Sequence, residues 1–186
     1  MRELQFIVDW IFSFIVGLFL LRLIFQVVRT DFRNPLVQSI VRLTNPLILP
    51  LRRILPPIGR IDSASVAAVL LTQIVGTALS RSFGGFGLPG PLQLLIGSVL
   101  TLVDTTLVLY LFAIFGYVLL SWVSQDGYNP AARVLGSLVE PVLRPLRRAL
   151  PALGGLDLSP MVALLLIQVL RMVLTDRIAP LLAGIG

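Results

Sequence analysis

Long apolar runs constrain this chain more than any other feature, because they set the solvent in which it folds. The runs cover residues 6–28, 63–79, 92–123 and 160–175. A helix of about 20 apolar residues crosses the hydrocarbon core of a bilayer, and the third run holds a single charge, Asp104. The mean hydropathy of +0.96 agrees with this interpretation. The sequence therefore predicts an all-α membrane protein with about four transmembrane helices.

A second constraint is an internal repeat with an offset of 95 residues. The stretch "NPLILPLRRILPPIGRID", which begins at Asn45, returns as "EPVLRPLRRALPALGGLD" from Glu140. Nine of the seventeen positions from Pro46 to Asp62 are identical after the shift. Each copy is interpreted as a helix, a basic proline-rich loop and a second helix. Because each copy has an even number of spans, the two repeats are parallel and related by a pseudo-axis along the membrane normal.

The repeat defines the domain organisation. The first repeat covers residues 1–80, with a helix at 6–28, an interfacial loop at 29–62 and a helix at 63–80. A connector follows at residues 81–99. The second repeat covers residues 100–186, with a helix at 104–124, an interfacial loop at 125–159 and a helix at 160–179. The third helix is placed at Asp104 because this residue aligns with Asp9. The alternative is one tilted helix over residues 92–123, about 48 Å long at 1.5 Å per residue.

The two loops combine prolines, apolar residues and arginines. Pro46, Pro50, Pro56 and Pro57 are expected to prevent one continuous helix through the first loop, although Pro35 to Leu43 suits a short surface helix. The residues between the prolines are too apolar to remain in water, so each loop is expected to lie in the membrane interface while its arginines reach the headgroups. The residues predicted to bind anionic lipid or a partner protein are Arg52, Arg53, Arg147 and Arg148. The alternative is that these arginines only hold the loops on one side.

The distribution of arginine predicts the orientation. The two loops at residues 29–62 and 125–159 hold ten of the fifteen basic residues. Loops rich in Lys and Arg tend to remain in the cytoplasm. We therefore expect a multi-pass protein with cytoplasmic basic loops and with both termini facing outward. Asp62 is expected to cap the helix that follows the first loop.

Polar residues inside the predicted spans form a second set of candidates: Asp9, Gln73, Asp104, Gln168 and Arg171. Arg171 is expected to form a structural ion pair with one of the two carboxylates, and a proton or ion relay is the alternative. The two glutamines are repeat equivalents near the midplane, where they could satisfy each other or line a pore. Arg22, near the end of the first span, is explained by snorkelling.

Composition excludes most catalytic chemistry. The chain has neither cysteine nor histidine, which removes thiolate nucleophiles, imidazole bases and the usual ligands of zinc or haem. The arginines lie beside membrane spans and are not interleaved with exposed aromatic residues, so direct nucleic-acid binding is not expected. The sequence predicts no enzyme, no cofactor and no metal site. Two classes remain: a non-catalytic membrane scaffold or assembly factor, and a small oligomeric ion channel or transporter.

The doubled motifs carry a resemblance to a known family. The stretches "LTNPLILPLRRILPPIGRIDSAS", "SWVSQ" and "EPVLRPLRRALPALGGLDLSP", together with the repeated "NP", resemble the YggT family of small bacterial membrane proteins, also called YlmG-like. The resemblance covers nearly the whole chain. It implies a helical protein of the bacterial inner membrane that is associated with tolerance of osmotic shock. In other relatives it implies links to cell division, nucleoid distribution and cytochrome assembly, which do not converge on one reaction.

Overall fold

The computed structural model describes residues 2–57, 62–85, 87–123, 129–150 and 157–180, and these residues form helices without any β-strand. The helices are α1 (Arg2–Val27), α2 (Pro35–Ile54), α3 (Ser63–Phe83), α4 (Pro91–Val123), α5 (Pro130–Ala149) and α6 (Ser159–Val173), which continues into the π-helical turn η1 (Leu174–Ile178). Helices α1, α3 and α4 are long and apolar enough to cross a membrane. The prediction of an all-α membrane protein is confirmed. Helix α6 has 15 residues before the π-helical turn, so a count of four spans stays a prediction.

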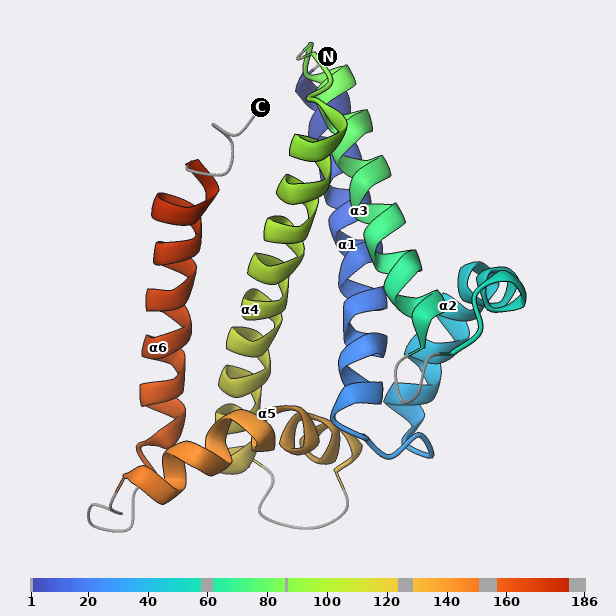
Figure 1. Cartoon of the computed structure of the whole chain (residues 1–186). Helices are drawn as coiled ribbons and strands as arrows, with labels where there is room; N and C mark the ends of the chain where they lie inside the picture. Colours follow the sequence, from blue (N-terminus) through green and yellow to red (C-terminus); the bar gives the residue numbers. More distant parts are fainter. Residues whose placement is uncertain (1, 58–61, 86, 124–128, 151–156, 181–186) are drawn as a thin grey trace.

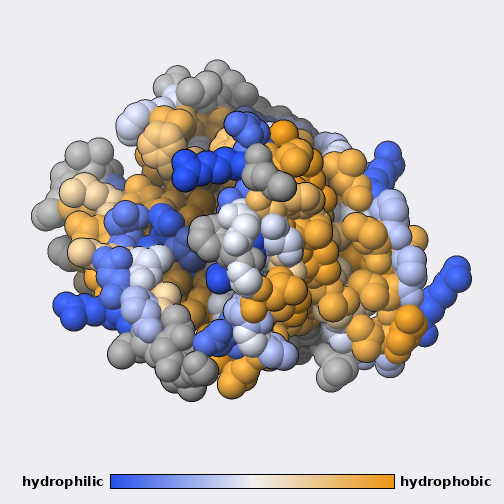
Figure 2. Space-filling model, turned by 90° about the horizontal axis from the view of Figure 1, so that it is seen from above, coloured by the Kyte–Doolittle hydropathy of each residue, from blue (hydrophilic) through white to orange (hydrophobic). Residues whose placement is uncertain are grey.

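The helices fall into two groups by direction (Figure 1). Helices α1, α3, α4 and α6 extend along the length of the molecule, and α6 stands on the far side of α4 from α1 and α3. Helices α2 and α5 lie across one end of this group, which we call the arginine end. The beginning of α1 and the end of η1 lie at the opposite end, which we call the terminal end. Figure 2, which looks onto the terminal end, shows hydrophobic residues covering large parts of the surface.

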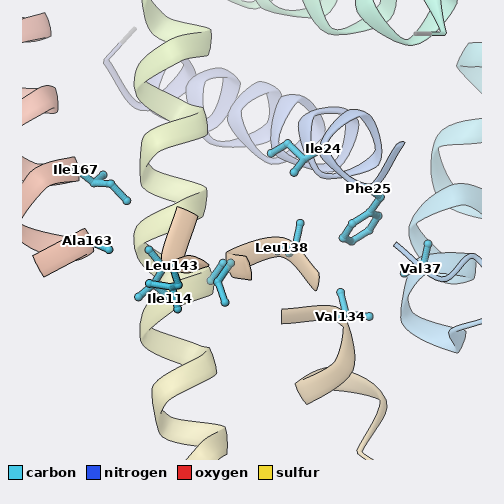
Figure 3. Close-up of a cluster of buried hydrophobic side chains, with 11 residues drawn as sticks. Ile24, Phe25, Val37, Ile114, Val134, Leu138, Leu143, Ala163 and Ile167 are labelled. Carbon is cyan, nitrogen blue, oxygen red and sulfur yellow. The ribbon is translucent and has the colours of Figure 1, made fainter. Parts of the chain in front are cut away.

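Two clusters of buried apolar side chains hold the crossing helices against the long ones. The larger cluster joins α5 to α1, α2, α4 and α6, and includes Phe25, Ile114 and Leu143 (Figure 3). The smaller cluster packs Ile48 of α2 against α1 and α3. Burial of apolar surface stabilises these contacts by about 25 cal/mol per Å². Part of the apolar surface of α2 and α5 is therefore buried against the rest of the protein, whereas Leu43, Leu47 and Ile54 of α2 remain exposed.

Helices α2 and α5 both continue through internal prolines, although those of α2 were expected to interrupt a helix. Pro46 and Pro50 lie inside α2, so the expectation is wrong for these two positions, and their repeat equivalents Pro141 and Pro145 lie inside α5 in the same way. A proline inside a helix removes one hydrogen bond and crowds the carbonyl group four residues earlier. In each helix the two prolines are four residues apart and exposed, so both defects fall on the outer side. There, water or lipid headgroups can satisfy the freed carbonyl groups.

Helix α4 also differs from the preferred expectation. The alignment of Asp104 with Asp9 in the internal repeat predicts that this span starts at Asp104, but the helix is continuous from Pro91 to Val123. Proline is well tolerated in the first turn of a helix, since its missing N–H would have had no partner there. The residues that follow are mostly apolar and contain no second proline. The connector between α3 and α4 is correspondingly shorter than expected, because α3 continues to Phe83.

The two pairs of equivalent long helices pack differently. Helices α1 and α3 are in close contact, because Gly76 lies directly against Phe12. A Cβ atom at residue 76 would lie 2.8 Å from three atoms of that phenylalanine. The residue 95 positions further on is Arg171, and α6 stands apart from α4 along much of its length (Figure 1). The small residue thus allows close helix contact in the first pair, whereas a long charged side chain spans the second.

Candidate functional site

The candidate site is formed by the two crossing helices at the arginine end. Both helices begin at a proline that follows an asparagine cap: the Asn34 side chain accepts a hydrogen bond from the Leu36 N–H, and Asn129 caps α5 in the same way. Each helix then buries a set of apolar residues on its inner side, although Leu43, Leu47 and Ile54 of α2 are exposed. The exposed side of α2 carries Arg42, Arg52 and Arg53, and that of α5 carries Arg144 and Arg148. This division is typical of helices that lie in a membrane interface.

Two of the four arginines predicted to bind lipid form ion pairs that hold the fold together. Arg52 donates to Oδ2 of Asp62 from Nε at 3.0 Å and from Nη2 at 2.6 Å. Arg147, 95 residues later, donates from Nε to Oδ2 of Asp157 at 2.8 Å and from Nη1 to Oε2 of Glu140 at 2.9 Å. Each pair joins the last turn of a crossing helix to the segment that precedes the next long helix. The first arginine of each "RR" pair is therefore structural.

These ion pairs change the pKa values of the groups involved. Burial alone would raise the pKa of Asp62, but hydrogen bonds from Arg52 and Ser65 outweigh it and hold the pKa below its ordinary value. Burial likewise opposes the shift at Asp157, where Arg147 and Ser159 lower the pKa. The bond to Asp157 is the main reason that the pKa of Arg147 is raised. Asp62 is the N-cap residue of α3, as predicted, but its carboxylate accepts hydrogen bonds from the side chains of Arg52 and Ser65 and none from the helix backbone.

The second arginine of each pair is available for binding. Arg53 and Arg148 are exposed, and neither forms an ion pair or side-chain hydrogen bond with another residue in the part of the chain that the structure describes. Arg42 and Arg144 are also exposed and form no ion pair or side-chain hydrogen bond among the described residues. The free guanidinium groups carry donors that suit phosphate or carboxylate oxygens. Helices α2 and α5 thus carry two arginines held in ion pairs, Arg52 and Arg147, and four exposed arginines without a partner among the described residues, Arg42, Arg53, Arg144 and Arg148.

Arg22 has a role that sequence reasoning missed. Its side chain is only 2% exposed, and Nη1 lies 2.7 Å from Oγ1 of Thr44, 2.9 Å from Oδ1 of Asn45 and 3.2 Å from the carbonyl oxygen of Val41. The snorkelling interpretation is therefore wrong, because the guanidinium is directed into α2 rather than toward the membrane surface. The polar pair Thr44 and Asn45, inside an otherwise apolar stretch, is the sequence signal that could have indicated this contact.

A polar junction joins the beginnings of the two crossing helices. Nδ2 of Asn34 donates to the carbonyl oxygen of Pro130 at 2.8 Å, and the hydroxyl groups of Thr30 and Ser137 lie 3.0 Å apart. Asn34 is nearly fully buried. Asn34–Pro35 and Asn129–Pro130 therefore start the two crossing helices, and Asn34 also fixes α2 to the start of α5. The repeated "NP" is visible in the sequence, but nothing in the sequence indicated this contact.

The structure brings together one of the predicted intramembrane pairs. Arg171 donates from Nε to Oδ1 of Asp104 at 2.7 Å and from Nη2 to Oδ2 at 3.1 Å, which is a bidentate arrangement. Both side chains are about one quarter exposed, at 28% and 27%. The pair links α6 to α4 and neutralises two charges within the long helices. Asp9, the other candidate carboxylate, is exposed on α1 and has no ion-pair partner in the described chain.

The two glutamines are not brought together. The Gln73 side chain donates to Oγ1 of Thr77 on the same helix at 3.1 Å. Gln168 is exposed on α6 and makes no hydrogen bond through its side chain with the residues described. Helix α4 lies between α3 and α6, so the expectation that the two amides satisfy each other is wrong (Figure 1).

A cavity of about 460 Å³ opens near the terminal end between α3, α4 and the end of η1, where Thr77, Arg81 and Thr101 contribute to its lining. A second hollow of about 320 Å³, between α1, α3 and α4, is lined almost wholly by apolar residues. Among the described residues no cluster of three or more acidic side chains could hold a metal ion.

Comparison with known proteins places this arrangement in a family. The CCB3/YggT family model matches the chain twice, over residues 1–83 and 96–178. An uncharacterized protein of Pseudomonas aeruginosa is 44% identical over 161 residues, covering 86% of this chain and 82% of the relative. The YggT protein of Escherichia coli K12 is 37% identical over 172 residues, covering 92% and 89%, and a Vibrio alginolyticus protein is 36% identical over 184 residues, covering 97% and 98%. No solved structure matches the chain.

Proposed function

The chain belongs to the CCB3/YggT family, and we propose that it is a non-catalytic membrane scaffold that holds anionic phospholipid headgroups against its arginine end. The observation that carries this proposal is the placement of α2 and α5 across the ends of the long helices (Figure 1), where both helices expose arginines without a partner among the described residues. A helix in this position lies at the depth of the headgroups when the long helices cross the bilayer.

Four arginines without partners in the described chain would supply the binding energy: Arg42, Arg53, Arg144 and Arg148. A basic residue near an anionic leaflet contributes roughly 1 kcal/mol, so four together contribute about 4 kcal/mol. The attraction decreases within a Debye length of about 8 Å at physiological ionic strength. Lipid contact at this end should therefore be strong, selective for anionic headgroups and sensitive to salt.

Orientation and location follow from the same proposal. We place the arginine end in the cytoplasm and the terminal end outside, because basic segments next to spans tend to remain inside. The membrane is then the bacterial inner membrane, whose cytoplasmic leaflet supplies the anionic lipid. A role in osmotic stress rests on the family resemblance alone. A scaffold of this kind could also present the arginine end to a membrane-protein partner.

The ion-channel alternative has less support. A permeation path needs polar groups that line one continuous route across the bilayer. Gln73 is bonded within α3, Gln168 lies on the exposed side of α6, and Arg171 is neutralised by Asp104. These residues do not converge on one path in the described chain. We therefore retain the scaffold as the proposed function.

The proposal is tested by lipid retention. The variant Arg53→Gln/Arg148→Gln removes two free arginines at equivalent positions and leaves both structural ion pairs intact. Its matched control is Arg2→Gln/Arg177→Gln, which removes the same charge from the terminal end. Native mass spectrometry of protein purified from mixed lipid should show fewer retained anionic lipids for the first variant only. Equal retention by both variants and the parent would contradict the proposal.

A further inference from the structure

The cavity near the terminal end takes no part in lipid binding at the arginine end, yet it has the features of a binding site. Its volume of about 460 Å³ is typical of sites for small molecules, which measure about 300–1,000 Å³. Of the described residues that line it, Arg81 alone carries a charge, so the fixed charge of the lining is positive. Hydrophilic residues gather at this end of the molecule beside the hydrophobic surface (Figure 2). The lining therefore favours an anion over a cation or a wholly apolar molecule.

Arg81 has donors that no described residue uses. Its Nε donates to the carbonyl oxygen of Gly87 at 3.3 Å, which holds the side chain beside the loop between α3 and α4. Its two Nη groups form no ion pair or hydrogen bond with the residues that the structure describes. The planar guanidinium suits carboxylate, phosphate and sulfonate oxygens, which it can bind through two parallel hydrogen bonds. Arg81 can therefore hold an oxyanion at the mouth of the cavity.

Thr77 provides a second donor one turn deeper. It lies four residues before Arg81 on α3, and both side chains line the cavity. Nε2 of Gln73 donates to Oγ1 of Thr77 at 3.1 Å, so the threonine acts as the acceptor in this contact. No described carbonyl group accepts the hydroxyl proton of Thr77, whereas Thr101 on the α4 wall donates its own to the carbonyl oxygen of Gly97 at 2.9 Å. Gln73 therefore leaves the hydroxyl of Thr77 free to donate to an anion held by Arg81.

The inner end of the cavity leads to the ion pair between Arg171 and Asp104. Leu100 and Thr101 line the cavity, and Asp104 lies one turn further along the same side of α4. Both members of the ion pair are more than one quarter exposed, at 28% and 27%, although they lie among the long helices. Charged groups at such a depth usually face the interior of a bundle or a water-filled cavity. Water that enters through the cavity and reaches the pair would account for this exposure.

The cavity is open near the terminal end and closed toward the arginine end. Gly97 lies on its wall, and no atom is found within 4 Å of a Cβ atom added there. Toward the arginine end, Ile167 precedes Arg171 by one turn, is 6% exposed and belongs with Ala163 and Ile114 to the larger apolar cluster (Figure 3). The described helices therefore provide a polar space with one entrance, which suits a binding site and not a path across the membrane.

We propose that this cavity is a water-filled site that binds a small oxyanion (a carboxylate, phosphate or sulfonate) entering from the terminal end. Arg81 holds the anion, Thr77 donates a further hydrogen bond to it, and Gln73 positions Thr77. The anion is a water-soluble solute and not a lipid headgroup, because the ion pair beyond Thr101 needs water around it and not an acyl chain. The proposal goes beyond lipid binding at the arginine end and does not depend on it.

Access of charged thiol reagents tests the site, because the chain has no cysteine of its own. Full-length protein with Thr101→Cys is placed in lipid vesicles and treated with two membrane-impermeant methanethiosulfonates, one carrying a sulfonate and the other a trimethylammonium group. Val103→Cys is the matched control, since it lies at nearly the same depth on the opposite side of α4 and lines the apolar hollow. Leu88→Cys, exposed at the terminal end, reports the fraction of protein with that end toward the reagent. Thr101→Cys should react about tenfold faster than Val103→Cys, because a thiolate forms readily only in water.

Charge selectivity provides the second arm. At Thr101→Cys the sulfonate reagent should react faster than the cationic one, after each rate is divided by that of the same reagent at Leu88→Cys. Arg81→Gln in the same chain should lower this ratio about tenfold. Arg177→Gln, which removes a charge from the same end but not from the cavity lining, should leave the ratio unchanged. Thr77→Val should slow the sulfonate reagent alone, and an excess of inorganic phosphate should protect the cysteine unless Arg81 is replaced.

Several results would overturn the proposal. Equal rates at Thr101→Cys and Val103→Cys would show that water does not enter, and Gly97→Cys gives the same comparison if Thr101→Cys does not fold. A sulfonate preference that is absent, or that Arg81→Gln leaves unchanged, would exclude an anion site at this arginine. Reaction in detergent but protection in vesicles would show that a lipid occupies the cavity, which also contradicts the proposal.

Discussion

Arg52 joins the last turn of α2 to Asp62 immediately before α3, with Nη2 of the arginine 2.6 Å from Oδ2 of the aspartate. The same contact recurs between Arg147 and Asp157, where the distance from Nε to Oδ2 is 2.8 Å. Both pairs are separated by ten residues and close the turn between a crossing helix and a long helix. The "PLRR" motif and the aspartate that follows it therefore work as one unit, in which only the second arginine remains free.

The first prediction concerns Asp62→Asn. The folded-state pKa of Asp62 is lowered, so the stability it contributes is present above its ordinary pKa of 3.8 and is lost as the pH falls through the folded value. At pH 7 the substitution should lower the free energy of unfolding by about 2 kcal/mol, since a charged hydrogen-bond partner is removed. Thermal unfolding in detergent at pH 7 and pH 3 measures this, and the variant should lose part of the parent's acid sensitivity.

Asp157→Asn supplies the comparison for that prediction. The carboxylate of Asp157 is 45% exposed, against 8% for Asp62, so solvent screens its ion pair more strongly. Its substitution should cost about 0.5 kcal/mol. An equal or larger loss for Asp157→Asn would contradict the inference that the pair with the buried Asp62 carboxylate contributes more to stability than the pair with the exposed Asp157 carboxylate.

A second prediction concerns the ion pair between Arg171 and Asp104. Arg171→Leu leaves a carboxylate without its partner among the long helices, and this should destabilise the protein by about 2 kcal/mol, since both groups are partly exposed. Asp104→Leu/Arg171→Leu removes both charges and should recover most of the loss. A double-mutant cycle of thermal unfolding gives the coupling free energy. Additive effects of the two single substitutions would show that the contact is not energetically significant.

A third prediction concerns the contact of Gly76 with Phe12. Gly76→Leu places a side chain where even a Cβ atom would lie 2.8 Å from the phenylalanine ring, so α1 and α3 must separate. Overpacking of this kind costs about 1–3 kcal/mol. Phe12→Ala in the same chain should restore part of the stability. Gly97→Leu is the control, because no atom lies within 4 Å of a Cβ added there.

A fourth prediction concerns Arg22→Met, which keeps the bulk of the side chain and removes its hydrogen bonds to α2. The Asn45 amide oxygen then loses the donor that lies 2.9 Å away, which should cost about 1–3 kcal/mol. Because the loss is confined to the α1–α2 contact, hydrogen exchange should increase in α2 more than in α5. Equal exchange in the two helices would show that Arg22 does not hold α2 in place.

Sequence reasoning predicted the class of fold because apolar length and hydropathy determine whether a helix can cross a bilayer. It failed where tertiary contacts decide the outcome. Pro46 and Pro50 are compatible with a continuous helix only because both fall on its exposed side, and this depends on how α2 packs. The position of Asp104 in the repeat suggested a helix start, yet nothing near it interrupts the helix that begins at Pro91.

The candidate site was predicted in outline but not in detail. The four arginines of the two "RR" pairs do lie on the crossing helices, but sequence could not distinguish the paired from the free member of each, because the partner aspartate lies ten residues away beyond a turn. Arg22 resembled a snorkelling residue by its position alone. Its burial depends on Thr44 and Asn45, which reach it only after α2 has folded against α1.

Selection of anionic lipid by the free arginines on α2 and α5 is the core of the proposed function. It can be measured with spin-labelled phospholipids in liposomes that contain the protein, by comparing the motionally restricted fraction of an anionic label with that of a zwitterionic one. We expect preference for the anionic label, a decrease of that preference as salt is raised, and its reduction in Arg53→Gln/Arg148→Gln but not in Arg2→Gln/Arg177→Gln. Equal association of both labels with the parent protein, or a preference unchanged by the Arg53 and Arg148 substitutions, would show that these arginines do not select lipid.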